Sequence, residues 1–141
     1  VPMSSTMVVL GLDIDSTVVT HAYPLMGEDI GAVPWLKMAL EKYPALRIMV
    51  CTMRSGEPLE LARVWLEERG IPVWALNAHP EQAEWTESPK PAEWTESPKP
   101  YAHYYVDDRA VGVPLRLDRC IDWERYGPML MADLERDLGG H

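Results

Sequence analysis

Residues 7–17 read MVVLGLDIDST, and this stretch decides the fold class. Met7 to Leu12 is an uninterrupted aliphatic run that ends in a carboxylate, which is typical of a strand buried on both faces of a parallel sheet. A second apolar run, residues 47–51 (RIMVC), follows a segment with helical spacing at residues 34–43. This alternation of strand and helix predicts an α/β fold around a parallel sheet.

The same alternation continues along the rest of the chain. Helical spacing returns at residues 58–69 and 129–138, and further strands are expected at residues 71–76, 102–106 and 113–117. We therefore expect a three-layer α/β sandwich, in which helices cover both faces of a Rossmann-like parallel sheet. The length fits a single domain, which we place at residues 3–138.

A tandem repeat interrupts this pattern. Residues 83–91 read AEWTESPKP, and residues 92–100 repeat them letter for letter. Their proline content excludes a central strand and predicts a long loop. One interpretation is a duplication tolerated at the surface, because a longer loop costs little extra closure entropy. The other is a lid, in which Trp85 or Trp94 covers a bound substrate.

Composition narrows the classes of partner. The chain has 141 residues, with 13 Lys and Arg against 22 Asp and Glu, and its net charge of −9 disfavours sequence-independent binding of nucleic acid. Two cysteines offer no disulfide framework, which favours a reducing, cytoplasmic location. No apolar run approaches the ~20 residues of a membrane helix, so we expect no membrane span. The oligomeric state is not predicted.

Carboxylates stand where two of the predicted strands end. Asp13 and Asp15 follow the first strand, while Asp107 and Asp108 follow residues 102–106. Ligands of an open α/β sheet bind beyond the carboxyl ends of its strands, so these side chains can converge. Thr52, after the second strand, and Lys99 could reach the same crevice.

Such a gathering of carboxylates requires a cation. Two like charges about 4 Å apart repel by about 4 kcal/mol at an effective dielectric constant of about 20. Oxygen ligands favour Mg²⁺ over zinc, which normally takes His or Cys. With the cation and Lys99 neutralising a substrate phosphate, Asp13 could attack it as a nucleophile.

The order of these residues resembles a known family. DxDST at residues 13–17, Thr52, Lys99 and the pair Asp107-Asp108 look like the four motifs of the haloacid dehalogenase (HAD) superfamily. Residues 51–71 and 99–110 are also similar to stretches of small HAD hydrolases. Only a flap at residues 20–30 and one helix separate the first two motifs, so the resemblance implies a minimal cap and an open site.

The resemblance also implies roles for these residues. Asp13 is the nucleophile that forms an aspartyl-phosphate, and Asp15 is the general acid for the leaving group and then the base for water. Lys90 shares its local sequence with Lys99, and spacing favours Lys99 as the motif lysine. The phosphate would be held by Thr52, Met53 and Lys99, and Mg²⁺ by Asp13, Asp15 (through its backbone carbonyl), Asp107 and Asp108.

The expected function is that of a Mg²⁺-dependent phosphomonoesterase acting on a small phosphate ester or a nucleotide. A polynucleotide end is an alternative substrate, and a catalytically silent HAD-like or receiver-like phosphate-binding module is an alternative function. A receiver carries its acceptor Asp near the end of the third strand, where VWALNAHP (residues 73–80) has none. Possible substrate contacts are His21, Arg54 and Arg109, although pairing with a surface carboxylate is a competing interpretation for either arginine.

Overall fold

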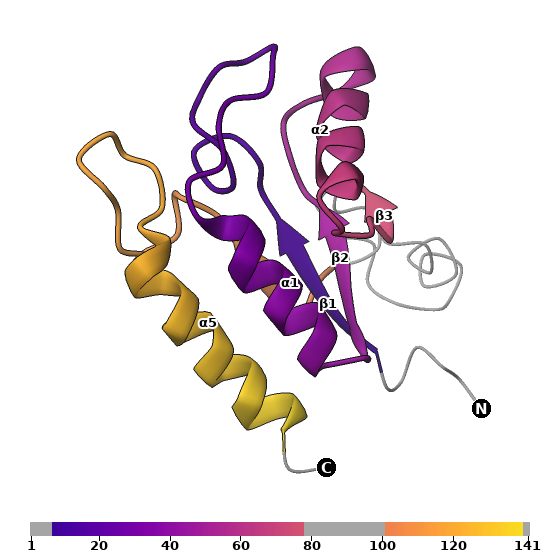
Figure 1. The fold of residues 1–141 in the computed structure, drawn as a ribbon, viewed down its shortest axis with the longest axis vertical. Helices are drawn as coiled ribbons and strands as arrows, with labels where there is room; N and C mark the ends of the chain where they lie inside the picture. The colour runs from indigo at the N-terminus through magenta and orange to yellow at the C-terminus, as the bar shows by residue number, and fades with distance from the viewer. Residues whose placement is uncertain (1–6, 78–100, 140–141) are drawn as a thin grey trace, which may run out of the picture.

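The computed structural model describes residues 7–77 and 101–139. Within these ranges it contains four strands and three helices in the alternating order of an α/β fold (Figure 1). The strands are β1 (Val8–Leu12), β2 (Leu46–Val50), β3 (Ala75–Leu76) and β4 (Tyr104–Val106). The helices are α1 (Ala32–Lys42), α2 (Gly56–Glu68) and α5 (Trp123–Leu138).

The four strands form one parallel sheet in the order β3-β2-β1-β4. From β1 the chain adds β2 and then β3 on one side, and then places β4 on the other side of β1. Strand order therefore reverses between β1 and β4. The carboxyl ends of these two strands form a topological switch point, where open α/β sheets bind their ligands.

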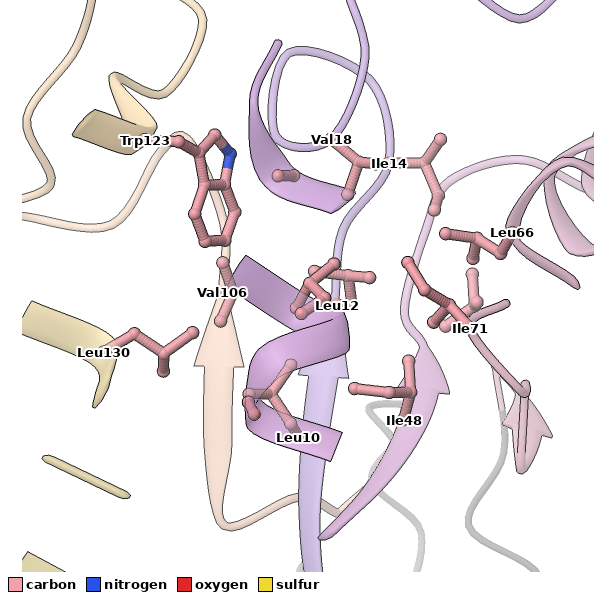
Figure 2. Packing of buried hydrophobic residues seen from close by; sticks show 14 of the residues in the cluster. Leu10, Leu12, Ile14, Val18, Ile48, Leu66, Ile71, Val106, Trp123 and Leu130 are labelled. Atoms are coloured by element: carbon pink, nitrogen blue, oxygen red, sulfur yellow. The ribbon is translucent and has the colours of Figure 1, made fainter. Parts of the chain in front are cut away.

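All three helices contribute to a hydrophobic core on one face of the sheet. Alternate residues of β1, Leu10 and Leu12, point to this face together with Ile48 of β2 and Val106 of β4 (Figure 2). They meet side chains from the helices, namely Leu36 and Ala39 of α1, Ala62 and Leu66 of α2, and Leu130 and Leu134 of α5. Figure 1 shows α1 and α5 side by side, and both helices pack on this same face of the sheet.

The opposite face of the sheet carries a smaller cluster. Val9 of β1 and Met49 of β2 pack there with Ala102, Cys51 and Trp74. The three described helices all join the larger cluster. Among the described residues no helix covers this face, so the second helical layer expected from the sequence stays a prediction. The repeated segment at 83–100, with Trp85 and Trp94, lies outside the described residues.

The expected strand at residues 113–117 is wrong. Leu115 forms only an isolated antiparallel bridge to Ile121, and neither residue joins the sheet. Pro114 lacks the N–H that a paired strand needs, and Asp118 closes a tight turn by accepting the Cys120 N–H at 3.1 Å. The strands expected at 71–76 and 102–106 are present but shorter, at Ala75–Leu76 and Tyr104–Val106.

The last helix begins six residues earlier than the predicted start at Met129. Pro128 lies inside α5 rather than at its first turn. The first turn is closed by bonds from the Arg125 and Tyr126 N–H groups to the Asp122 carbonyl, at 3.1 and 2.8 Å. The buried indole of Trp123 donates to the Thr17 carbonyl at 2.6 Å, so the first turn of the helix is anchored beside the β1 loop.

Close packing of α5 against α1 depends on Gly127. A Cβ at this position would lie 2.2 Å from Cε2 of Trp35. We expect Gly127→Ala to lower the free energy of unfolding by about 1–3 kcal/mol, because overpacking outweighs the better helix propensity of Ala. The exposed Met129 on the same helix supplies the control: Met129→Ala should change stability by less than about 0.5 kcal/mol. Urea unfolding of the wild type and both variants measures these changes. If Gly127→Ala were as stable as Met129→Ala, the close packing of Gly127 against Trp35 would be contradicted.

No helix in the described part of the chain combines the length and the apolar character needed to cross a bilayer.

Candidate active site

Three neighbouring strands each deliver polar residues to the same edge of the sheet. Asp13 follows β1, Thr52 lies two residues beyond β2, and Asp107 follows β4. Parallel pairing continues just past the strands, because the Asp13 N–H donates to the Val106 carbonyl at 2.9 Å and the Cys51 N–H to the Leu12 carbonyl at 2.8 Å. The backbone therefore places Asp13 between the residues that follow its two neighbouring strands.

Three carboxylates converge at the switch point. Asp13, Asp107 and Asp108 each bring an oxygen to within 4.8 Å of the other two, and all three are partly buried. Carboxylate oxygens are ligands for hard cations, and three of them gathered this closely could hold a metal ion. The convergence expected from the sequence is thus present for these three residues.

Without a cation, this arrangement disfavours the ionised form of Asp13. Burial, followed by the charge of Asp107, raises the pKa of Asp13 from 3.8 to about 7. The Asp108 side chain raises this pKa further, while the Thr17 hydroxyl opposes the shift by hydrogen bonding to the carboxylate. A cation placed among these carboxylates would favour the ionised form of Asp13.

Thr17 links two of the carboxylates. The side chain is fully buried, and its Oγ1 lies 3.0 Å from Oδ2 of Asp13 and 3.3 Å from Oδ1 of Asp108. The same oxygen accepts the Asp108 N–H at 3.0 Å. The sequence analysis included Thr17 in the DxDST motif but gave it no role. The available signal was its spacing, because a hydroxyl four residues after Asp13, on the loop that follows β1, can reach back to the Asp13 carboxylate.

Loss of the Thr17 hydroxyl is expected to destabilise the protein. Thr17→Val preserves the shape of the side chain but removes the hydrogen-bond partner of the Asp108 N–H and of the Asp13 carboxylate. We expect the free energy of unfolding to fall by about 1–3 kcal/mol in denaturant titrations. Thr17→Ser keeps the hydroxyl and should retain most of this stability. A loss of stability in Thr17→Ser with none in Thr17→Val would show that the methyl group, rather than the hydroxyl, matters.

The loop after β2 is shaped by Asn77, a residue that sequence reasoning missed. Its Oδ1 accepts the Thr52 N–H at 2.8 Å, and its Nδ2 donates to the Arg54 carbonyl at 3.2 Å. Asn77 has a φ of +52°, a left-handed conformation that Asn tolerates better than most residues. The Thr52 hydroxyl accepts the Arg54 N–H at 3.1 Å and keeps its own O–H as a donor.

Two adjoining hollows open around Asp13. One, of about 520 Å³, lies toward the sheet face of the smaller cluster, with Gly11 and Tyr105 in its lining. The other, of about 540 Å³, lies beneath the flap, with His21 and Tyr23 in its lining. Both are bordered by Asp13, Thr52, Met53, Asp107 and Arg109. Arg109 and His21 therefore stand where the sequence analysis expected substrate contacts.

Arg54 borders the hollow beneath the flap, but its contacts favour the competing interpretation, in which it pairs with a carboxylate. Its side chain is only 1% exposed, because it forms a two-pronged ion pair with Asp15. Nε lies 2.8 Å from Oδ2 of Asp15, and Nη2 lies 2.7 Å from Oδ1. The carboxylate of Asp15 thus faces Arg54, whereas those of Asp13, Asp107 and Asp108 face one another. Lys90 and Lys99 lie outside the described residues.

Comparisons with known proteins bear on the fold alone. No protein-family model matches the sequence, and no curated protein matches it. The chain is similar to a solved structure of a conserved protein from Bacteroides thetaiotaomicron, with 28% sequence identity and a TM-score of 0.65. The similarity covers 96% of this chain and 98% of that one. The two proteins therefore share an architecture over nearly their whole lengths, compatible with a Rossmann-like α/β fold.

Proposed function

We propose that this protein is a Mg²⁺-dependent phosphomonoesterase of the HAD type, with a three-layer core and a minimal cap. The convergence of Asp13, Asp107 and Asp108 at the switch point carries the proposal. Three partly buried carboxylates this close together repel one another, and a bound cation would offset that cost. Oxygen-only donors select a hard ion such as Mg²⁺, which readily shares its coordination with a substrate phosphate.

Asp13, Asp107 and Asp108 would hold the ion, together with the Asp15 backbone carbonyl. When bound, Mg²⁺ neutralises charge on the carboxylates and on the phosphate, so that an anionic nucleophile can approach. An Asp13 oxygen then attacks phosphorus, and the bond from phosphorus to the leaving oxygen breaks. Thr17 fixes the orientation of the Asp13 carboxylate, while the Thr52 hydroxyl and Lys99 bind phosphoryl oxygens.

Asp15 handles the protons in this scheme. It gives one proton to the departing oxygen and later removes one from the water that hydrolyses the aspartyl-phosphate. Arg54 occupies one lone pair on each Asp15 oxygen, which leaves about two of roughly four acceptor positions for this exchange. Asp15 lines the hollow under the flap, where the leaving group would lie.

The substrate class follows from charge and openness. The net charge of −9 works against a long polyanion, so a small phosphate ester or a nucleotide fits better than a polynucleotide end. The hollow under the flap, with His21, Tyr23 and Arg109 in its lining, can receive a small leaving group.

A panel of phosphate esters tests the proposal. Nucleotides, sugar phosphates, an aryl phosphate and phosphorylated oligonucleotides are incubated with the protein, with and without Mg²⁺. We expect release of phosphate that depends on Mg²⁺ and is lost in Asp107→Asn. Asp118→Asn is the matched control, because Asp118 pairs with Arg116 on an exposed loop and lines neither hollow beside Asp13. Binding of Mg²⁺ with no turnover of any ester would instead favour a catalytically silent module.

A further inference from the structure

Arg54 is a buried arginine whose donors are all used. Nε and Nη2 donate to Asp15, and Nη2 also donates to the Leu25 carbonyl at 2.8 Å. Nη1 donates to the carbonyls of Pro24 and Pro58, at 3.1 and 3.0 Å. Arginine has five N–H donors in a fixed planar fork, and each of them has an acceptor here. A group this completely satisfied and 1% exposed is not free to bind a substrate.

These contacts join three separate parts of the chain. Pro24 and Leu25 belong to the flap at residues 20–30, Pro58 lies in the first turn of α2, and Asp15 lies on the loop after β1. The ring of Tyr23, also in the flap, stands 5.3 Å from Cζ of Arg54, in the range of a cation–π contact. Arg54 is therefore the centre to which the flap, the β1 loop and α2 are all tied.

The tip of the flap depends on Arg54 for its position. The base of the flap is held by backbone bonds, from the Thr20 N–H to the Glu28 carbonyl at 2.9 Å and from the Ile30 N–H to the Val18 carbonyl at 3.2 Å. Residues 21–25 are exposed, and within the described chain the hydrogen bonds that tie this tip to other segments are those donated by Arg54. His21 and Tyr23 of the tip line the hollow beside Asp13.

We propose that Arg54 is a positioning residue, which fixes Asp15 and the flap together and so sets the shape of the leaving-group hollow. The inference rests on the proposed function and adds the device that holds the leaving-group side of the site. Arg54 contacts none of Asp13, Asp107 and Asp108, and it holds Asp15 by the carboxylate rather than by the backbone carbonyl proposed for the ion, so we expect its replacement to change metal affinity and phosphate binding little. Turnover depends on Arg54, because Asp15 and the leaving group must be aligned.

Arg54→Lys tests the inference while keeping the buried positive charge. Lysine can pair with Asp15 as a point charge, but it lacks the planar fork that reaches three carbonyls as well. We expect hydrogen–deuterium exchange at residues 20–30 to accelerate by about tenfold or more, while exchange in β1 and β2 stays unchanged. With an aryl phosphate we expect kcat to fall by about 100-fold, with little change in KM or in Mg²⁺ affinity.

Arg63→Lys is the matched control, because Arg63 lies on α2 and pairs with Glu60 and Glu67 at the surface. It should leave exchange and kinetics as in the wild type. Two results would overturn the inference and leave the phosphatase proposal intact. One is a rate of hydrogen–deuterium exchange at residues 20–30 of Arg54→Lys that equals that of the wild type. The other is faster exchange at these residues with an unchanged kcat. A wild-type protein without turnover would overturn the proposed function, and the exchange measurement would still decide whether Arg54 fixes the flap.

A second measurement needs no variant, in case Arg54→Lys fails to fold. In ¹⁵N NMR spectra of the wild-type protein, the Nε–H of Arg54 should give a separate signal that exchanges slowly with water, because it is buried and donates to Asp15. The exposed Arg125 supplies the rapidly exchanging reference. If the Nε–H of Arg54 exchanged as fast as that of Arg125, Arg54 would not be held in place by Asp15, which would contradict the inference.

Discussion

Asp13→Asn is expected to lower the turnover of phosphate monoesters by at least about a thousandfold, because the amide cannot form the aspartyl-phosphate. Asn has nearly the same shape and can still accept the Thr17 hydroxyl, so the variant should fold. Steady-state kinetics with an aryl phosphate and saturating Mg²⁺ measures the effect.

Asp118→Asn provides the control for this loss, since it makes the same chemical change on an exposed loop. Its kcat should equal that of the wild type. Full activity in Asp13→Asn would exclude Asp13 as the nucleophile, whatever the metal dependence of the reaction.

Removal of the Asp13 charge should also stabilise the metal-free protein at alkaline pH. Burial and Asp107 raise the pKa of Asp13 to about 7 in the folded state, against 3.8 for an ordinary Asp. Between these values the folded state holds a proton that the unfolded state has lost, so rising pH costs stability, and the loss is complete above about pH 7. We expect Asp13→Asn to unfold with a free energy higher than the wild type by on the order of 3 kcal/mol at pH 8.

The difference should nearly vanish at pH 4, where Asp13 is protonated in the folded protein. Other carboxyls titrate in the opposite sense; for example, the backbone N–H of Cys120 lowers the pKa of Asp118. Their contributions are common to the two proteins and cancel in the comparison. Urea unfolding in the presence of a chelator, at pH 4, 6 and 8, gives the three differences. If the difference in free energy of unfolding between the two proteins stayed constant from pH 4 to pH 8, the ionised Asp13 would not be what destabilises the metal-free protein.

Much of the fold was predictable because its signals are local. The apolar run before Asp13 predicted β1 to within a residue, and helical spacing predicted α1 and α2 with small errors at their ends. The expected strand at 113–117 failed because Leu115 and Leu117 are exposed in the structure, and the five-residue sequence alone does not reveal this. The start of α5 was missed because proline is uncommon inside a helix, and Pro128 lies between the observed start at Trp123 and the predicted start at Met129.

The candidate site also contains residues that the sequence could place and residues that it could not. Asp13, Asp107 and Asp108 could be placed together because parallel strands bring their carboxyl ends to one edge. Arg54 could not be assigned, because its role depends on carbonyls at Pro24, Leu25 and Pro58, and no side-chain pattern encodes a backbone acceptor. Asn77 was missed for a related reason, since its amide acts on the loop after β2 from a position 25 residues further along the chain.

Chemical trapping of the intermediate tests the central claim most directly. An aspartyl-phosphate is an acyl phosphate, which borohydride reduces to homoserine. The protein is therefore mixed with an aryl phosphate and Mg²⁺, quenched with borohydride, digested and analysed by mass spectrometry. Our account predicts homoserine at position 13, only when substrate and Mg²⁺ are both present. Turnover of the substrate with Asp13 recovered unmodified, or with homoserine at another carboxylate, would contradict it.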